Sequence, residues 1–302
     1  MPPRIAIPMP HSTDPEYAER SIPQYELAVK LAGGEPVRIP LDQPPAEIAK
    51  IMQGCDAVLL PGSKADVDPA KFGEPRSPHT APADPRRDTV DFLLLEDAFT
   101  KRKPILGICY GLQSLNVYRT GSLIQHIPDF LPVELRTRVN HEAGKNVAVA
   151  HNVEIEKDSK LAEIVTGQHC LKVREGPKVQ EGREARERPE IQDGREVREG
   201  HGLSRADTAG QEIRALAPEG NPVLPVNSSH HQSAATIGAE LRVAARCQED
   251  GIVEAIEGTF PDHFVLAVQW HPERSTDHDE ASRNLFRALV KAAEQWQKHP
   301  EV

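Results

Sequence analysis

The residues best suited to chemistry are grouped around Cys109, where an apolar segment, 104–108, runs into Gly107-Ile-Cys109-Tyr110-Gly111. A Gly-x-Cys-x-Gly sequence between a strand and a helix predicts a tight turn that presents its central side chain as a nucleophile. The glycines suit this turn because they carry no Cβ atom. Free N–H groups at the start of the following helix favour a thiolate at Cys109, and the Tyr110 amide is a candidate donor to an oxyanion.

A possible base lies far along the chain, in the segment Phe264-Val-Leu-Ala-Val-Gln-Trp-His271-Pro-Glu273. Pro272 disfavours the helical conformation at His271, so the chain is expected to stay extended there. Residues i and i+2 of an extended chain face the same way, which lets Glu273 reach the imidazole. A carboxylate in that place would orient His271 and stabilise its imidazolium form when it takes the thiol proton.

The other three cysteines, Cys55, Cys170 and Cys247, are interpreted as small buried hydrophobes. They form no CxxC pair, so reduced thiols are expected rather than disulfides or a zinc site. The formal net charge is -10 and aromatic residues make up only 4%. Both values argue against nucleic-acid binding and leave a small molecule as the expected partner. No apolar run is long enough for a membrane span, and the N-terminal segment has no signal-peptide pattern, so a cytoplasmic location is expected.

The elements that must position these residues alternate between strands and helices in the first half of the chain. Strands are predicted at 4–8, 36–40, 56–61 and 104–108, and helices at 23–31, 46–52 and 89–101. This alternation predicts right-handed crossovers and a mainly parallel sheet. The second half has short strands at 152–155, 223–227, 241–246, 253–257 and 264–270, followed by a helix at 280–298. Their close spacing suggests an antiparallel extension of the same sheet.

Between the halves lies a charged segment, at about 173–220, with almost no apolar residues in its first part. A 12-residue unit occurs twice there, at 177–188 and 189–200. Such a composition cannot support a core of its own, so the segment is interpreted as a solvated, flexible insertion into one domain that spans residues 1–302. A role as a lid or a docking arm is the alternative to repeat expansion in a tolerant surface loop.

Four segments of the chain carry a family resemblance: 61–69, 87–117, 226–232 and 268–273. The chain resembles the class I glutamine amidotransferase-like superfamily, in particular its γ-glutamyl hydrolase-like branch of cysteine peptidases (the peptidase C26 type). It looks most like the γ-glutamyl-γ-aminobutyrate hydrolases. The resemblance implies a three-layer α/β/α fold whose central sheet is mostly parallel with an antiparallel extension. Relatives often have glycine where Ser63 stands and arginine where Tyr110 stands.

The resemblance also implies an activity: hydrolysis of γ-glutamyl amines through a γ-glutamyl thioester. Its catalytic triad would be Cys109, His271 and Glu273, with an oxyanion hole from the backbone at Gly62 or Ser63 together with Tyr110. No cofactor and no metal enter such a scheme. The candidate substrate-binding residues are Gln113, Ser229, His230 and His231.

Several polar residues have a second interpretation. His230 and His231 could suggest a metal, but adjacent strand residues point to opposite faces and no third ligand lies at a diagnostic spacing. One of the pair is expected to line the substrate pocket or brace its wall, and a plain structural role is the alternative. Asp66 and Asp68 suit turn chemistry. Asp88, beside Arg87, is interpreted as a helix cap, with a role in the pocket as the alternative, and Gln113 either contacts substrate or packs.

Two other functions remain open on the sequence alone. The first is a glutaminase subunit that supplies ammonia to a separate synthetase, since no P-loop or ATP-binding domain is recognisable here. The second is a non-catalytic binding protein on the same fold. The amine half of the substrate is not defined by the sequence. A homodimer is compatible with it, although the sequence does not fix the oligomeric state.

Overall fold

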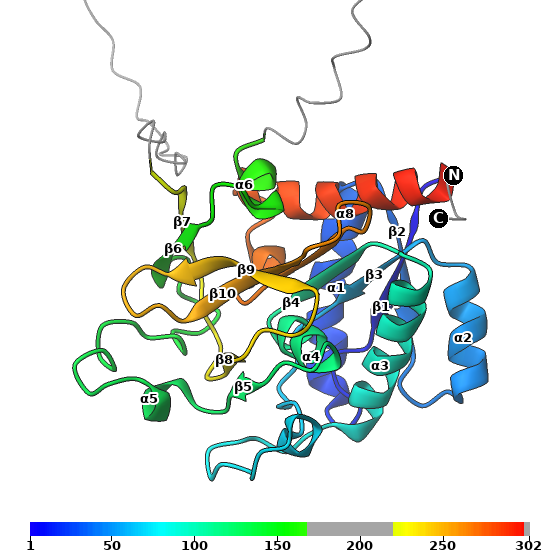
Figure 1. Ribbon diagram of the computed structural model, residues 1–302. Coiled ribbons are helices and arrows are strands. Elements are labelled where there is room, and N and C mark those ends of the chain that lie inside the picture. Colours follow the sequence, from blue (N-terminus) through cyan, green and yellow to red (C-terminus); the bar gives the residue numbers. More distant parts are fainter. Residues whose placement is uncertain (168–219, 299–302) are drawn as a thin grey trace, which may run out of the picture.

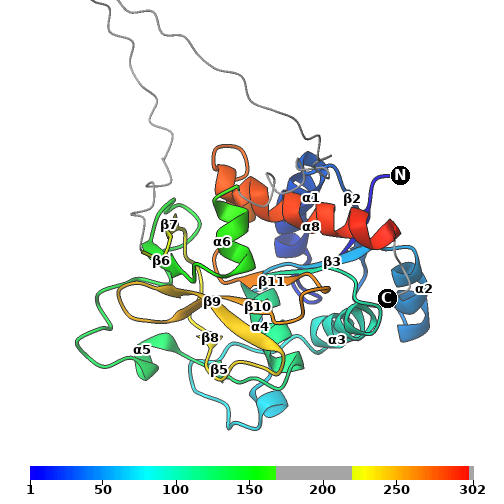
Figure 2. The ribbon, with the colours of Figure 1, turned by 45° about the horizontal axis from the view of Figure 1, so that its top comes forward.

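The computed structural model describes residues 1–167 and 220–298. Within these ranges nine strands form one sheet in the order β2-β1-β3-β4-β11-β10-β9-β6-β7, and a small second sheet pairs β5 with β8. Helices cover both faces of the large sheet (Figures 1 and 2). The predicted α/β class with three layers is therefore confirmed. The insertion expected at about 173–220 lies, except for Gly220, outside the described residues.

One half of the large sheet is parallel, as the strand–helix alternation predicted. Apart from the edge strand Glu35–Ile39, its strands are apolar and almost completely buried, which is the composition expected where helices cover both faces. They are β1 (Arg4–Pro8), β2 (Glu35–Ile39), β3 (Ala57–Leu60), β4 (Ile105–Ile108) and β11 (Val265–Val268). All five run in the same direction, so their carboxyl ends meet at one edge of the sheet.

The other half of the sheet is antiparallel, which confirms the predicted extension. It begins where β10 pairs with β11 and continues through β9 and β6 to the edge strand β7. These strands are β6 (His151–Ile155), β7 (Val223–Val226), β9 (Leu241–Cys247) and β10 (Val253–Gly258). The small sheet consists of β5 (Leu123–Ile124) and β8 (Ser233–Ala234).

Two hydrophobic cores lie on opposite faces of the sheet. On one face the strands pack against α1 (Pro15–Leu31), α6 (Lys160–Val165) and α8 (Glu280–Lys298). On the other face they pack against α2 (Pro45–Gln53), α3 (Pro85–Thr100) and α4 (Tyr110–Tyr118). The buried stripe of α8 includes Leu285, Phe286 and Leu289, which matches the amphipathic pattern of its sequence.

The largest departure from the predicted elements is at α1, which begins at Pro15 rather than near Pro23. Asp14 caps it by accepting a hydrogen bond from the Tyr17 amide at 2.9 Å, and Pro15 occupies the first helical position, where its missing N–H costs nothing. Pro23 lies inside the helix. The start predicted at residue 23 was therefore too late, because the cap and the buried face formed by Ala18 and Ile22 decide the boundary. No helix among residues 1–167 and 220–298 has the length and apolar character needed to cross a membrane.

Candidate active site

Cys109 lies at the sharp turn between β4 and α4, directly after the carboxyl end of a central parallel strand. Its backbone φ is 54°, in the left-handed region that residues other than glycine rarely adopt. A Cβ atom on Gly111 would lie 2.3 Å from the carbonyl oxygen of Leu60, and one on Gly107 would lie 2.9 Å from that of Gly111. Close packing therefore requires both glycines, and the turn presents the thiol at the N-terminus of α4.

His271 follows β11, and its Nδ1 atom lies 2.7 Å from Oε1 of Glu273. Both side chains are buried. Burial lowers the pKa of His271, but Glu273 and Cys109 outweigh it and raise that pKa to about 9. Burial also works against the charge on Glu273, yet the imidazole outweighs it and lowers the pKa of the carboxyl. Since a carboxylate can only accept, Nδ1 carries the proton toward Glu273 and Nε2 remains for the thiol.

The thiol and the imidazole lie on either side of Gly62, which follows β3. A Cβ atom there would lie 3.0 Å from Cε1 of His271 and 3.7 Å from Cβ of Cys109. The Cys109 side chain contributes to the raised pKa of His271. The three carboxyl ends of β3, β4 and β11 thus bring together residues that are more than 160 positions apart in the chain.

The backbone N–H groups around this site differ in whether they already have a hydrogen-bond acceptor. The Gly62 amide donates a hydrogen bond to the hydroxyl of Tyr25 at 3.1 Å, so it is already occupied. The Tyr110 amide is at the first position of α4, where an N–H group has no partner within the helix. Of the two loop residues expected from the sequence, Ser63 is therefore the better source of the second amide. Tyr25 was not identified from the sequence, because a tyrosine inside an amphipathic helix has no distinguishing pattern.

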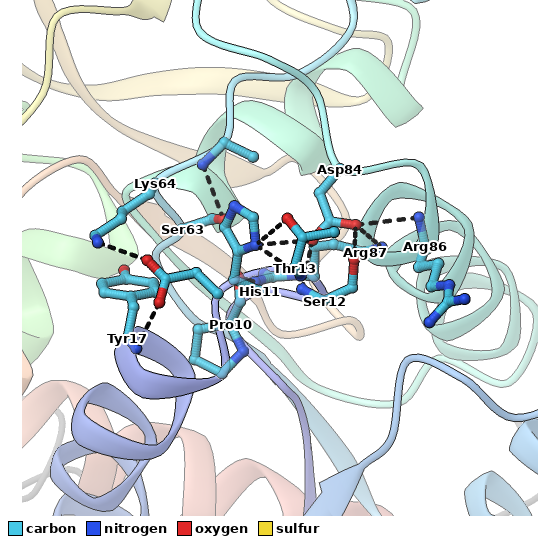
Figure 3. A network of polar contacts seen from close by, with 12 residues as sticks. Pro10, His11, Ser12, Thr13, Tyr17, Ser63, Lys64, Asp84, Arg86 and Arg87 are labelled. Atoms are coloured by element: carbon cyan, nitrogen blue, oxygen red, sulfur yellow. Dashed lines mark hydrogen bonds and ion pairs between the residues drawn. The ribbon is translucent and has the colours of Figure 1, made fainter.

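A polar network holds the loop that contains Ser63 (Figure 3). Its Oγ atom accepts a hydrogen bond from the Ala65 amide at 3.1 Å. The next residue, Lys64, forms a 2.7 Å ion pair with Asp14 at the start of α1, and its ammonium group lies 4.9 Å from the ring centroid of Tyr17. The loop that ends β3 is therefore tied to the helix that follows β1.

A second set of contacts supports the same loop from the side of α3. Ser12 binds both carboxylate oxygens of Asp84, with its amide and its hydroxyl, each at 2.6 Å (Figure 3). The buried Arg87 donates to the carbonyl oxygens of Pro10 at 3.1 Å and Pro61 at 2.7 Å. A 2.6 Å ion pair with Asp91 compensates the Arg87 charge. One guanidinium thus joins the ends of β1 and β3 beside the candidate site.

Asn227 is a positioning residue that sequence reasoning missed. Its side chain donates to the carbonyl oxygen of His271 at 2.9 Å and accepts from the amide of the same residue at 3.0 Å. This pair of hydrogen bonds fixes the backbone that carries the imidazole. The sequence did offer a signal, since Asn227 begins the Asn-Ser-Ser-His-His-Gln segment directly after β7.

The four candidate substrate-binding residues are not in one place. The hydroxyl of Ser229 accepts a hydrogen bond from Arg274, which lies beside Glu273, so Ser229 is next to the triad. His231 is partly exposed and contacts Asp66 at 3.1 Å. Gln113 and His230, by contrast, are buried and are engaged inside the protein. The amide nitrogen of Gln113 lies 3.3 Å from both the carbonyl oxygen of residue 232 and the side-chain oxygen of residue 269.

Two of the smaller predictions are decided by the structure. The cap of α3 is Asp84, which accepts from the amides of the two arginines that follow Pro85. The assignment of this role to Asp88 was wrong, because α3 begins at Pro85 and Asp88 lies within its first turns. Asp88 instead accepts a hydrogen bond from the hydroxyl of Tyr110 and pairs with Lys71. Asp68 does cap a short turn through the Ala70 amide, as predicted.

Comparison with protein families gives one match that covers most of the chain. The peptidase C26 family matches residues 6–175 and 167–273. A protein of Rickettsia prowazekii named as glutamine amidotransferase-like is 30% identical, over 92% of this chain and 90% of its own length. The γ-glutamyl-γ-aminobutyrate hydrolase of Escherichia coli O157:H7 is also 30% identical, over 90% of this chain and 85% of its own length.

Among solved structures, the glutaminase domain of Trypanosoma brucei CTPS with bound acivicin has the same fold. Its TM-score is 0.51 and its sequence identity is 18%, with 97% of this chain and 94% of that chain covered. At this identity the likeness concerns the fold alone. It agrees with the mixed sheet described above.

Proposed function

The chain belongs to the peptidase C26 family, and on that premise we propose that it hydrolyses the amide bond of γ-glutamyl amines with Cys109 as nucleophile. The observation that carries the proposal is the geometry of one buried group of residues. A cysteine in a strained turn at a helix N-terminus lies beside an imidazole whose other nitrogen is 2.7 Å from a carboxylate. That arrangement fits the requirements of a thiolate nucleophile with an oriented base.

In the first half of the reaction the Cys109 thiolate adds to the γ-carbonyl carbon of the substrate. The electron pair of the carbonyl moves to oxygen, and the amides of Tyr110 and Ser63 stabilise the resulting oxyanion. The intermediate then collapses with cleavage of the C–N bond. Imidazolium His271 gives its Nε2 proton to the departing amine, and the γ-glutamyl group remains on sulfur as a thioester.

In the second half a water molecule attacks the thioester carbonyl. Neutral His271 takes a proton from the water, and the same two amides stabilise the second oxyanion. Cleavage of the C–S bond releases glutamate and restores the thiolate–imidazolium pair. Glu273 holds the tautomer throughout, because it accepts the hydrogen bond from Nδ1 in both halves.

For substrate binding we propose Ser229 and His231, which lie on the segment that follows Asn227. The hydroxyl of Ser229 and its partner Arg274 are close to the triad, and the positive charge of the arginine suits a carboxylate of the substrate. Burial of Gln113 and His230 favours structural roles for these two residues.

The test is to trap the thioester. The protein is mixed with a panel of γ-glutamyl amines, quenched in acid, and examined by intact-protein mass spectrometry. A γ-glutamyl adduct on Cys109 that forms and decays with turnover is the expected result. The His271→Ala variant should form far less adduct and the Cys109→Ala variant none. Turnover without any adduct on Cys109 would contradict the proposal.

A glutaminase role is the second candidate, because a relative named as glutamine amidotransferase-like matches over the same length of chain. The two functions differ in the amine that leaves. A hydrolase should turn over larger γ-glutamyl amines without any partner protein. Turnover of glutamine alone, and only after a synthetase is added, would favour the glutaminase role instead.

A further inference from the structure

A second polar cluster lies in the antiparallel half of the sheet, away from the triad. Three imidazoles and one carboxylate meet there, contributed by two strands and two loops. The members of this histidine cluster are His141, in the loop before β6, His151, at the start of β6, His230, in the loop after β7, and Glu254 of β10. All four side chains are at least 95% buried.

The three imidazoles converge on one oxygen atom. Oε1 of Glu254 lies 3.3 Å from Nδ1 of His141, 3.1 Å from Nε2 of His151 and 3.4 Å from Nε2 of His230. None of these contacts has hydrogen-bond geometry. Among the described residues, neither oxygen of Glu254 and neither ring nitrogen of His151 has a hydrogen-bond partner. Buried polar atoms without partners are costly, so the cluster lacks something that would satisfy them.

The outer hydrogen bonds of the cluster decide which nitrogens carry protons. His141 donates from Nε2 to the carboxylate of Asp250 at 2.8 Å, and His230 donates from Nδ1 to the carbonyl oxygen of residue 232 at 2.9 Å. Since those acceptors have no proton to give, a neutral ring in either place turns a lone pair toward Glu254. Lone pairs and a carboxylate oxygen that face one another repel, and a cation between them would remove that repulsion.

We propose that this cluster binds one divalent transition-metal ion of the zinc class, held by His141, His151 and Glu254. A tetrahedral ion with bonds of about 2.0 to 2.1 Å keeps neighbouring ligand atoms about 3.3 Å apart. The nitrogen–oxygen separations of His141 and His151 from Glu254 match that spacing. Donor atoms of His141, His151 and Glu254 all lie within 4.8 Å of one another. His230 contacts the same oxygen of Glu254 from outside this group.

The surroundings of the cluster fit a structural metal site. A histidine that ligates a metal usually donates its other N–H to a carboxylate or a carbonyl, and His141 does this toward Asp250. Two positive charges on the ion balance the negative charges of Glu254 and Asp250.

The ion has a route into the protein and an effect at the active site. A cavity of about 180 Å³ has His141 and His230 in its wall. The carbonyl oxygen of His141 accepts hydrogen bonds from the Ser228 hydroxyl at 2.7 Å and the His230 amide at 2.9 Å. The neighbouring Asn227 holds His271, so the cluster anchors the segment that positions the base. Protons on two of the imidazoles are the competing explanation.

The experiment uses the full chain without an affinity tag. The protein is dialysed against EDTA and then against metal-free buffer, and is titrated with ZnCl2 by calorimetry. Metal retained after desalting is measured by mass spectrometry, and thermal unfolding is recorded with and without zinc. We expect about one zinc per chain and a higher unfolding temperature with zinc. A wild-type protein that retains no stoichiometric zinc and unfolds at the same temperature in both conditions would overturn the proposal.

Matched variants locate the ion. Glu254→Gln should lose zinc binding, and the milder Asp250→Asn should weaken it about 10- to 100-fold by releasing His141. Exchange of His79 and His126 for alanine removes a more exposed pair beside Asp129 and should leave the affinity unchanged. Cobalt substitution gives a second readout that does not depend on the stability of a variant, because its absorption spectrum reports the ligand set.

An alternative set of metal ligands can be recognised by its effect on zinc affinity and on the cobalt spectrum. Cys247, His141 and Asp250 also bring donor atoms within 4.8 Å of one another. Cys247→Ser should leave zinc affinity and the cobalt spectrum unchanged if Glu254 is a ligand. Loss of zinc in Cys247→Ser with retention in Glu254→Gln, or a thiolate charge-transfer band with cobalt, would place the ion on Cys247 and overturn the proposal.

Discussion

The triad and the histidine cluster both combine histidine with glutamate, but they arrange these residue types in two different ways. In the triad one imidazole has one carboxylate at 2.7 Å and one thiol, so each ring nitrogen has a distinct partner. In the histidine cluster three imidazoles share one oxygen of Glu254, and none of the three contacts is a hydrogen bond. The first arrangement suits proton transfer and the second suits a cation. Proton transfer depends on the pairing of each nitrogen, whereas metal binding depends on the convergence of several nitrogens.

The largest expected effect is on the catalytic side of this comparison. Cys109→Ala should lower kcat by about 10⁴-fold or more, because no other residue can form the thioester. Its unfolding temperature and its zinc content should stay close to those of the wild type, since the histidine cluster is untouched. Steady-state kinetics, thermal unfolding and metal analysis check this.

Iodoacetamide provides the control for that variant. The Cys109 thiolate should be alkylated faster than a free thiol, while the buried Cys55 and Cys247 should react slowly. A Cys109 that reacts no faster than a free thiol, together with unchanged activity in Cys109→Ala, would identify the protein as a non-catalytic member of the fold.

The sharpest comparison exchanges the two glutamates for glutamine. Glu273→Gln should lower kcat by about 10³- to 10⁴-fold, because the imidazole loses the acceptor that fixes its tautomer. Glu254→Gln should instead lower the free energy of unfolding by about 3 to 5 kcal/mol, because the proposed buried zinc ion loses its carboxylate ligand. Denaturant unfolding and kinetics on both variants separate the two roles. If the two variants lost the same stability, or the same kcat, the two glutamates would not have the separate roles proposed here.

Asn227 connects the two regions and should have an intermediate effect. In Asn227→Ala the backbone of His271 loses two buried hydrogen bonds, so kcat should fall about 10- to 100-fold while KM changes little. The histidine cluster should keep its zinc, because Ser228 still anchors the segment to His141. A rise in KM with an unchanged kcat would show that Asn227 contacts substrate rather than positioning the base.

The smallest expected effect concerns pH. His271 has a pKa raised from 6.5 to about 9, and the proposed reaction needs its imidazolium form to protonate the leaving amine. kcat/KM should therefore fall as the pH rises through about 9. The contribution of this pair to stability is fully present below pH 6.5 and is lost as the pH rises through about 9. In Glu273→Gln the alkaline limb of a pH–rate profile should move to lower pH, and an unmoved limb would assign it to another group.

The sequence predicted most of the fold because its elements are marked locally. Buried parallel strands are short apolar runs, and α8 shows a full amphipathic repeat between Glu280 and Lys298. The predicted starts of helices were less accurate where local sequence signals conflicted. The first helix was predicted to start at Pro23, although Asp14 and Pro15 provided a better start eight residues earlier. Asp88 resembled a cap for the same reason, since the position of the cap depends on where the helix begins.

For the chemistry, the sequence by itself singled out the residues that we propose as the nucleophile and its base. The glycines around Cys109 are a local pattern that predicts a tight turn. The pair His271 and Glu273 is a local pattern that predicts two side chains on the same side of an extended chain. Only the tertiary structure decided which other residues surround and position them. It assigned the Gly62 amide to Tyr25, gave Asn227 its role, and gathered the histidine cluster from four separate segments. A spacing rule for metal ligands could not find that cluster, because the pairing of β6, β9 and β10, and not their order in the chain, brings its members together.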